Sequence, residues 1–240
     1  MPHNPDLGVS RPMLVCAVPI RGIGELNPPS GCEAIELRLD YMGSEVEAKL
    51  NELSSLIKGL LSRVKVIVTV RDAEEGGVNQ VDPSLKFNVI NLAYESGALV
   101  DVEVEFVKKY AKYITSWSRV ILSRHIFNKR PGIRELINSD YALANSMNAF
   151  TYKVATINYD DLPELVELLV KEREVPVAIV PMHPVQRAAA IMLGTALMYC
   201  SMGDGTAPGQ LSLQECVRIQ EERVKVSNAG NRSHSYSTPS

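Results

Sequence analysis

Eight short apolar runs, each followed by a stretch of different character, constrain the fold of this chain more than any other feature. The runs are rich in β-branched residues and have the length of buried strands. We expect strands at Leu14–Ile20, Ala34–Asp40, Val64–Arg71, Leu99–Glu105, Arg119–His125, Phe150–Ile157, Pro176–Met182 and Ala196–Met202. Because strands that alternate with helices form parallel sheets, this order predicts an α/β fold.

The stretches between these runs carry apolar residues three and four positions apart, which is the period of an amphipathic helix. We expect helices at Ser44–Leu61, Pro83–Ser96, Asp160–Arg173 and Leu211–Val224. The second of these has a clear start, because an Asp and then a Pro occupy its cap and first turn. Eight strand–helix units in 240 residues are the content of a (β/α)8 TIM barrel.

Two parts of the chain depart from this rhythm. Only 13 residues, from Arg21 to Glu33, separate the first two strands, and they include Pro28 and Pro29, so we expect the first barrel helix to be truncated. The segment from Val226 is polar and nearly free of aliphatic residues, which predicts a flexible tail. We therefore divide the chain into an N-terminal extension (1–12), one catalytic barrel domain (13–225) and a C-terminal tail (226–240).

Composition narrows the classes of protein that remain. The formal net charge is −3, so no strong field draws the chain to nucleic acid or to anionic lipid. No stretch is long and apolar enough for a membrane span or a signal peptide, which favours a cytoplasmic protein with no membrane partner. The cysteines, Cys16, Cys32, Cys200 and Cys216, form no CxxC pair, and we expect them to be reduced thiols.

Polar residues at the ends of the second and third strands are candidates for a site, because barrel active sites form at the carboxyl ends of strands. Glu36 and Arg38 lie on one face of their strand and would point into the barrel. They could bind a ligand, or the charges could belong to a structural Glu–Arg pair across the barrel. Arg71 suits a carboxylate ligand, and Glu75 follows it before a Gly-Gly turn, although a solvated cluster of loop charges would look similar.

His125 ends the fifth expected strand, and Lys153 lies in the middle of the sixth. A lysine seldom lies in the middle of an apolar strand, because burial of an ammonium group is costly. Either the Lys153 side chain reaches outward to solvent, or its pKa falls and a neutral amine persists. A neutral buried amine is the nucleophile of Schiff-base enzymes, and a nearby histidine can serve as a general base.

A glycine-rich loop follows the last strand and carries Thr206 and Gln210, a hydroxyl and an amide that can hydrogen-bond a ligand. The chain has no GxGxxG or GxxxxGK[ST] motif for a nucleotide. Its four histidines are scattered, which does not favour a metal centre.

In order and spacing, these residues resemble type I 3-dehydroquinate dehydratase, the Schiff-base-forming barrel enzyme of the shikimate pathway. The resemblance runs from about Leu14 to Val224 and rests on the segments ELRLD (36–40), TVR (69–71) with EGG (75–77), SRH (123–125), YKVA (152–155) and TAPGQ (206–210). Each segment alone is weak evidence for the family. Five of them in the family's order are specific to it.

The resemblance implies a lyase that dehydrates 3-dehydroquinate to 3-dehydroshikimate, without a cofactor or metal. Lys153 would form the imine, His125 would transfer protons, and Glu75 would orient the histidine. The substrate-binding residues implied by the resemblance are Glu36, Arg38, Arg71, Arg187, Thr206 and Gln210. It also implies a homodimer in the cytoplasm with a small-molecule substrate.

The segment before Arg187 departs from the family pattern, because Gln186 stands where a serine is common and the family's glycines are missing. Cys16 stands where some members have a serine near the substrate, which leaves that contact open. Two alternatives also stay open: another Schiff-base lyase of the class I aldolase kind, and a catalytically inactive barrel that serves as a binding module.

Overall fold

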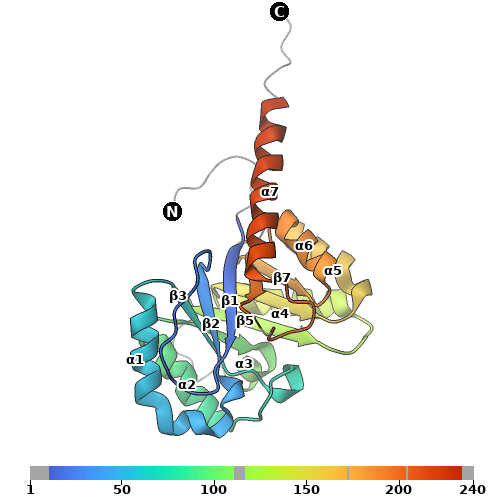
Figure 1. Cartoon of the computed structure of the whole chain (residues 1–240). Helices are drawn as coiled ribbons and strands as arrows, with labels where there is room; N and C mark the ends of the chain where they lie inside the picture. Colours follow the sequence, from blue (N-terminus) through green and yellow to red (C-terminus); the bar gives the residue numbers. More distant parts are fainter. Residues whose placement is uncertain (1–10, 111–116, 172, 204, 234–240) are drawn as a thin grey trace, which may run out of the picture.

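Eight parallel strands form one sheet that curls into a barrel, as the sequence predicted (Figure 1). The computed structural model describes residues 11–110, 117–171, 173–203 and 205–233. The strands are β1 (Met13–Pro19), β2 (Ala34–Arg38), β3 (Lys65–Thr69), β4 (Leu99–Glu103), β5 (Val120–Ile126), β6 (Thr151–Thr156), β7 (Val177–Pro181) and β8 (Leu197–Ser201). Hydrogen-bonded ladders join them in the order β7-β6-β5-β4-β3-β2-β1-β8.

The gap between β7 and β8 is bridged without a regular ladder. The backbone N–H of Ala196 donates to the carbonyl of Val177 at 2.8 Å. The hydroxyl of Thr195 accepts a hydrogen bond from the backbone N–H of Ile179 at 2.9 Å. One backbone bond and one buried side chain therefore complete the barrel at this seam.

Helices cover the outside of the barrel, and short helical turns follow several of the strands at its mouth. They are η1 (Leu39–Tyr41), η2 (Gly43–Lys49), α1 (Leu50–Leu61), η3 (Ala73–Glu75), α2 (Pro83–Glu95), α3 (Val104–Tyr110), α4 (Ile133–Ser146), η5 (Tyr159–Asp161), α5 (Leu162–Val170), α6 (Pro184–Leu193) and α7 (Leu213–Ser233). The start of α2 is capped as predicted, because the Asp82 carboxylate accepts from the Ser84 N–H at 2.8 Å.

Side chains of the strands alternate between two cores. The inner one fills the barrel with small and branched residues such as Val15, Ile67, Ile121 and Ala178. The outer one lies between the strands and the helices. This alternation places Lys153 inside the barrel, because its neighbours Tyr152 and Val154 belong to the outer core.

Several expected strands are too long at their carboxyl ends. β2 stops at Arg38, because the chain turns into η1, and β4 stops at Glu103, because α3 begins at the next residue. β3 stops at Thr69, so Arg71 follows the strand and does not lie in it. These early ends place charged side chains at the mouth of the barrel.

The truncation of the first helix is confirmed, because residues 20–33 form a loop without a helix. At the other end, α7 continues to Ser233, well past the predicted end at Val224, and its last turns project away from the barrel (Figure 1). The expected tail is therefore helical over 226–233. Residues 234–240 of that tail lie outside the described residues, as do residues 1–10 of the N-terminal extension.

The expectation of reduced cysteines is wrong. Cys16 of β1 is disulfide-bonded to Cys32, and Cys200 of β8 is disulfide-bonded to Cys216 of α7. The Cα–Cα distances are 5.9 and 6.6 Å, within the range of protein disulfides. Each bond ties a strand to the segment that covers its outer face. Cys16 therefore points away from the barrel interior and cannot make the substrate contact that the sequence left open.

Candidate active site

A small pocket opens where the carboxyl ends of the strands meet. Every predicted site residue except Glu75 lines it, and Glu75 reaches it through a contact with His125. The lining residues are Glu36, Arg38, Arg71, His125, Lys153, Ala155, Val180, Met182, Arg187, Tyr199, Thr206, Ala207 and Gln210. Segments far apart in the sequence thus converge at one place in the fold.

Lys153 is buried at the centre of this pocket and does not reach outward to solvent. Its ammonium group contacts the carboxylate of Asp101 on β4 and lies 4.5 Å from the centre of the Tyr199 ring. Burial lowers the pKa of Lys153 and the charge of Arg71 lowers it further, although the charge of Asp101 opposes both. This environment favours the neutral amine more than water does, which is what a nucleophilic lysine requires.

His125 lies at the end of β5, with its ring held by Glu75. The carboxylate oxygen Oε2 of Glu75 is 3.1 Å from Nδ1 of His125 and accepts from its backbone N–H at 2.8 Å. Burial lowers the pKa of His125 well below its usual value, and the charges of Arg71 and Lys153 add to this effect. The imidazole is therefore neutral near pH 7 and able to accept a proton.

Two glycines allow η3 to bring Glu75 to the histidine. Gly76 has a φ of 87°, in the left-handed region that L side chains avoid. A Cβ on Gly77 would lie 2.1 Å from the carbonyl oxygen of Arg71, so only glycine fits there. The Gly-Gly pair after Glu75 thus marks a tight turn at the barrel mouth, as the sequence suggested.

Arg71 is held by acidic residues of the barrel wall. Its guanidinium donates to Asp101 at 2.7 Å and to Glu103 at 2.8 Å. A third bond goes to the hydroxyl of Ser123 at 2.9 Å. Behind Glu103 lies Lys86 of α2, another buried cation, at 2.5 Å. Arg71 therefore organises the floor of the pocket, and substrate binding by Arg71 stays a prediction.

Neither Glu36 nor Arg38 forms the structural Glu–Arg pair that was the alternative for this strand. Arg38 forms a two-bond pair with Asp40, with both N–O distances at 2.8 Å. Glu36 instead accepts from the hydroxyl of Thr69 at 2.7 Å. Asp40 thus fixes the Arg38 guanidinium at the pocket edge, and Glu36 keeps acceptor capacity for a ligand.

Arg187 enters the pocket from the first turns of α6 and is fully buried. Its bonds go to the backbone carbonyls of Tyr199 and Pro208, at 3.5 and 3.2 Å, and Nε has no partner among the described residues. Burial lowers its pKa to about 10. A buried arginine without a carboxylate partner suits an anionic ligand, and substrate binding by Arg187 stays a prediction. The unusual Gln186 points elsewhere and donates to the carbonyl of Tyr159.

Thr206 and Gln210 close the pocket from the loop after β8. The Oε1 atom of Gln210 accepts from the backbone N–H of Thr206 at 2.8 Å. The amide nitrogen of Gln210 is buried and has no partner among the described residues. This leaves a donor free for a ligand in the pocket.

The sequence interpretation missed Tyr199 and Asp101. Tyr199 points inward from β8, and its hydroxyl is buried without a partner in the described chain. Asp101 provides the carboxylate beside Lys153, and its pKa is held below the usual range mainly by the charges of Arg71 and Lys153, against the effect of burial. The sequence contained a signal for both residues. Asp101 and Glu103 are two positions apart in an apolar strand and so share one face, and Tyr199 occupies a position of its strand whose side chain points into the barrel.

The pocket combines a buried amine, a neutral imidazole and unpaired donors for oxygen atoms. This set suits covalent chemistry at a ketone of a polar, anionic substrate. Among the described residues, no cluster of three or more His, Cys, Asp or Glu side chains could hold a metal ion. Over the same described ranges, none of the helices has the length and apolar character of a membrane span.

Comparisons with known proteins agree on one family. The family model described as type I 3-dehydroquinase matches residues 23–223. A 3-dehydroquinate dehydratase of Saccharolobus solfataricus is 30% identical, over 87% of this chain and 93% of that protein. A 3-dehydroquinate dehydratase of Ignicoccus hospitalis is 33% identical, over 85% of this chain and 94% of that protein.

Solved structures of the same fold support the barrel. The type I 3-dehydroquinate dehydratase of Clostridium difficile, solved with covalently modified comenic acid, has a TM-score of 0.71 at 23% identity. That match covers 91% of this chain and 94% of the other. A 3-dehydroquinate dehydratase from Geobacillus kaustophilus has a TM-score of 0.69 at 19% identity, over 87% and 90% of the two chains. At these identities the likeness concerns the fold.

Proposed function

The chain belongs to the type I 3-dehydroquinase family, and on that premise we propose that Lys153 forms a covalent imine with the substrate in the barrel pocket. The enzyme is a hydro-lyase that removes water from 3-dehydroquinate to give 3-dehydroshikimate. This is the third step of the shikimate pathway, which leads to chorismate and the aromatic amino acids. The roles of individual side chains are part of the proposal.

The first chemical step is attack of the Lys153 amine on the substrate ketone. A C–N bond forms as the Lys153 nitrogen, paired with Asp101 as an ammonium group beforehand, gives up two of its protons. The ketone oxygen takes both protons and leaves as water, and a positively charged iminium with one N–H remains. The carboxylate of Asp101, which contacts the lysine nitrogen, compensates the charge of the ammonium group and of the iminium alike. The iminium then acts as an electron sink for the next bond to break.

The second step is proton transfer by His125. The neutral imidazole takes a proton from the carbon next to the iminium, which gives an enamine. Collapse of the enamine expels the hydroxyl group, and His125 returns its proton so that water leaves. Glu75 holds the ring through Nδ1, which leaves Nε2 to carry the proton. Hydrolysis of the product imine consumes one water and restores Lys153.

The observation that carries this assignment is the set of unpaired donors around Lys153. Arg187, Tyr199 and Gln210 each bury a polar atom without a partner in the described chain, and all three line the pocket. Arg187 would bind the substrate carboxylate, because a guanidinium can donate to both oxygens. Glu36, Arg38, Arg71, Thr206 and Gln210 would hold the hydroxyl groups.

Borohydride reduction with 3-dehydroquinate tests the mechanism directly. We expect a stable adduct on the peptide that contains Lys153, found by peptide mass mapping, and none in a Lys153→Met variant. Turnover without an adduct would exclude the imine. A class I aldolase-like lyase would form an adduct with 3-dehydroquinate poorly and release no 3-dehydroshikimate. An inactive barrel would do neither.

We also propose that the enzyme is a cytoplasmic homodimer. The dimer is supported by three exposed apolar side chains: Ile157 after β6, Tyr159 at the start of η5 and Val185 in the first turn of α6. The Tyr159 ring lies 5.3 Å from the His183 ring, which places η5 beside the start of α6. Sedimentation of the intact chain tests the dimer. The two disulfides restrict the proposed location to a cytoplasm in which disulfides persist. Such a cytoplasm is oxidising or belongs to a hyperthermophile.

A further inference from the structure

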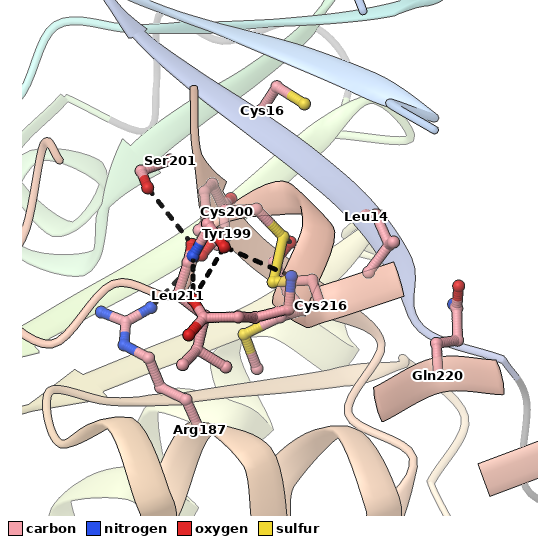
Figure 2. Close-up of a disulfide and its surroundings, with 12 residues drawn as sticks. Leu14, Cys16, Arg187, Tyr199, Cys200, Ser201, Leu211, Cys216 and Gln220 are labelled. Carbon is pink, nitrogen blue, oxygen red and sulfur yellow. Dashed lines mark hydrogen bonds between the residues drawn. A yellow bond between two sulfur atoms is a disulfide. The ribbon is translucent and has the colours of Figure 1, made fainter. Parts of the chain in front are cut away.

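The disulfide between Cys200 and Cys216 closes the base of the loop that carries two pocket residues. Cys200 lies at the end of β8, and Cys216 lies in the first turn of α7 (Figure 2). The two cysteines are 16 positions apart, and both are fully buried. The chain between them contains Thr206 and Gln210, so the bond turns the loop over the pocket into a closed ring.

Besides the disulfide, a short bridge between Ser201 and Ser212 closes the base of this loop, and Gly209 lies close against the backbone of Met182. The backbone N–H of Ser201 donates to the carbonyl of Leu211 at 2.8 Å, close to the disulfide (Figure 2). Arg187 donates to the carbonyl of Pro208 at 3.2 Å. Apart from Leu211, the described residues of the loop from 202 to 211 are exposed or half-buried. The loop therefore has almost no core of its own, and its position depends largely on how its ends are held.

The second disulfide provides a natural reference. Cys16 and Cys32 are also 16 positions apart, and Cys16 pairs in register with Cys200 on the neighbouring strand. The two bonds thus have the same ring size and begin at the same level of the barrel wall. The ring closed by Cys16–Cys32 contains the loop that replaces the first helix, and it contains none of the residues that line the pocket.

We propose that the Cys200–Cys216 disulfide positions Thr206 and Gln210 and thereby sets the affinity of the enzyme for its substrate. The inference rests on the proposed function of these two residues. An open ring gives the loop many more conformations, and only a fraction of them place both side chains at the pocket. Apparent affinity falls by that fraction, while the chemistry at Lys153 is unchanged once substrate is bound.

The test compares two double variants, Cys200→Ser/Cys216→Ser and Cys16→Ser/Cys32→Ser, with the unchanged chain. Alkylation of the denatured proteins with and without reductant first counts the disulfides. We expect opening of the Cys200–Cys216 ring to raise KM about fivefold or more, because the open loop should be in its binding position about one fifth of the time or less. The value of kcat should stay within about twofold of that of the unchanged chain. The Cys16–Cys32 variant should keep KM, although it loses thermal stability.

A second measurement tests the proposal even if Cys200→Ser/Cys216→Ser folds poorly. In Cys16→Ser/Cys32→Ser only the Cys200–Cys216 bond is left, so reduction of this protein opens that ring alone, and reoxidation should restore KM. Equal KM values with the bond open and closed would overturn the proposal. So would alkylation of Cys200 and Cys216 in the unreduced protein.

Hydrogen exchange separates this proposal from the proposed function. Peptides that cover 201–212 should exchange faster in Cys200→Ser/Cys216→Ser, and peptides that cover 20–33 should not. Faster exchange together with a raised KM supports the positioning role. Turnover with unchanged KM would refute the positioning role and leave the function standing. If the unchanged chain has no dehydratase activity, the proposed function fails. Equal hydrogen exchange of the loop in the unchanged chain and in Cys200→Ser/Cys216→Ser would refute the positioning role independently of activity.

Discussion

The carboxylate of Glu75 holds His125 twice, through the ring nitrogen at 3.1 Å and through the backbone N–H at 2.8 Å. One side chain therefore fixes both the end of β5 and the orientation of the imidazole. The same burial that makes this contact rigid raises the pKa of Glu75 to about 7. It lowers the pKa of His125 well below its usual value. These shifts make the pair a source of pH dependence in stability.

Glu75→Gln should change how stability depends on pH. Between the ordinary pKa of 4.5 and the folded value of about 7, the native protein keeps a proton on Glu75 that the unfolded chain has released. The contribution of Glu75 to stability is therefore fully present below pH 4.5 and is lost as pH rises to about 7. Relative to the unchanged chain, Glu75→Gln should gain about 3 kcal/mol across this window.

Urea unfolding at several pH values measures this effect. Glu74→Gln is the matched control, because Glu74 lies in the same turn, is exposed, and carries the same charge. Equal pH profiles for the two variants would show that the buried carboxylate is not the cause. Activity adds a second readout, since the amide introduced by Glu75→Gln can still accept from the His125 backbone but does not carry the charge that supports an imidazolium.

Arg187→Met should bind substrate poorly and remain at least as stable as the unchanged chain. Burial without a carboxylate partner lowers the pKa of Arg187 to about 10, so the charged group costs folding energy. Its loss removes that cost together with two bonds to backbone carbonyls. If Arg187 binds the substrate carboxylate, KM should rise about 100-fold.

Steady-state kinetics and thermal unfolding on one preparation test both parts of this prediction. Arg63→Met is the control for charge, because Arg63 is exposed and bonds to Leu26 and Asn27 outside the barrel. A large loss of stability in Arg187→Met with an unchanged KM would show that the arginine is structural.

Lys86→Met should have the opposite effect on stability. Lys86 is as deeply buried as Arg187, but its ammonium group pairs with Glu103 at 2.5 Å and Asp72 at 2.7 Å. Removal leaves the Glu103 carboxylate with one cation fewer inside the fold, which typically costs about 3–5 kcal/mol. Lys108→Met, at a cation that is 46% exposed, should cost less than about 1 kcal/mol. Denaturant unfolding of the three proteins compares these values.

The barrel could be predicted because its signal is repeated eight times along the chain. Errors in single elements, such as the early end of β2 at Arg38, did not change the topology. The convergence of Glu36, His125 and Lys153 follows from the barrel itself, since carboxyl ends of parallel strands meet at one mouth. What the family resemblance added was the role of each residue.

Pairings between individual side chains could not be predicted in the same way. Arg38 bonds to Asp40, because β2 ends between them and the turn brings the two side chains together. The cysteines gave a weak signal, since both pairs are spaced by 16 positions and begin on a strand. That spacing becomes informative only once the loop after β1 and the start of α7 are known to pack on the outer faces of β1 and β8.

Tyr199→Phe isolates a single oxygen atom in the pocket. The Tyr199 hydroxyl is buried without a partner in the described chain, which is unfavourable for the free enzyme. If it donates to a substrate hydroxyl, its loss should raise KM about tenfold, which corresponds to about 1.4 kcal/mol. The free variant should be as stable as the unchanged chain or slightly more so.

Tyr152→Phe is the matched control, because its hydroxyl is also buried and has no partner among the described residues, but lies in the outer core beside Tyr141. The two variants should gain stability alike in thermal unfolding, and only Tyr199→Phe should lose affinity. If their KM values are equal, the hydroxyl of Tyr199 does not contact the substrate and the ring acts only as the apolar wall beside Lys153.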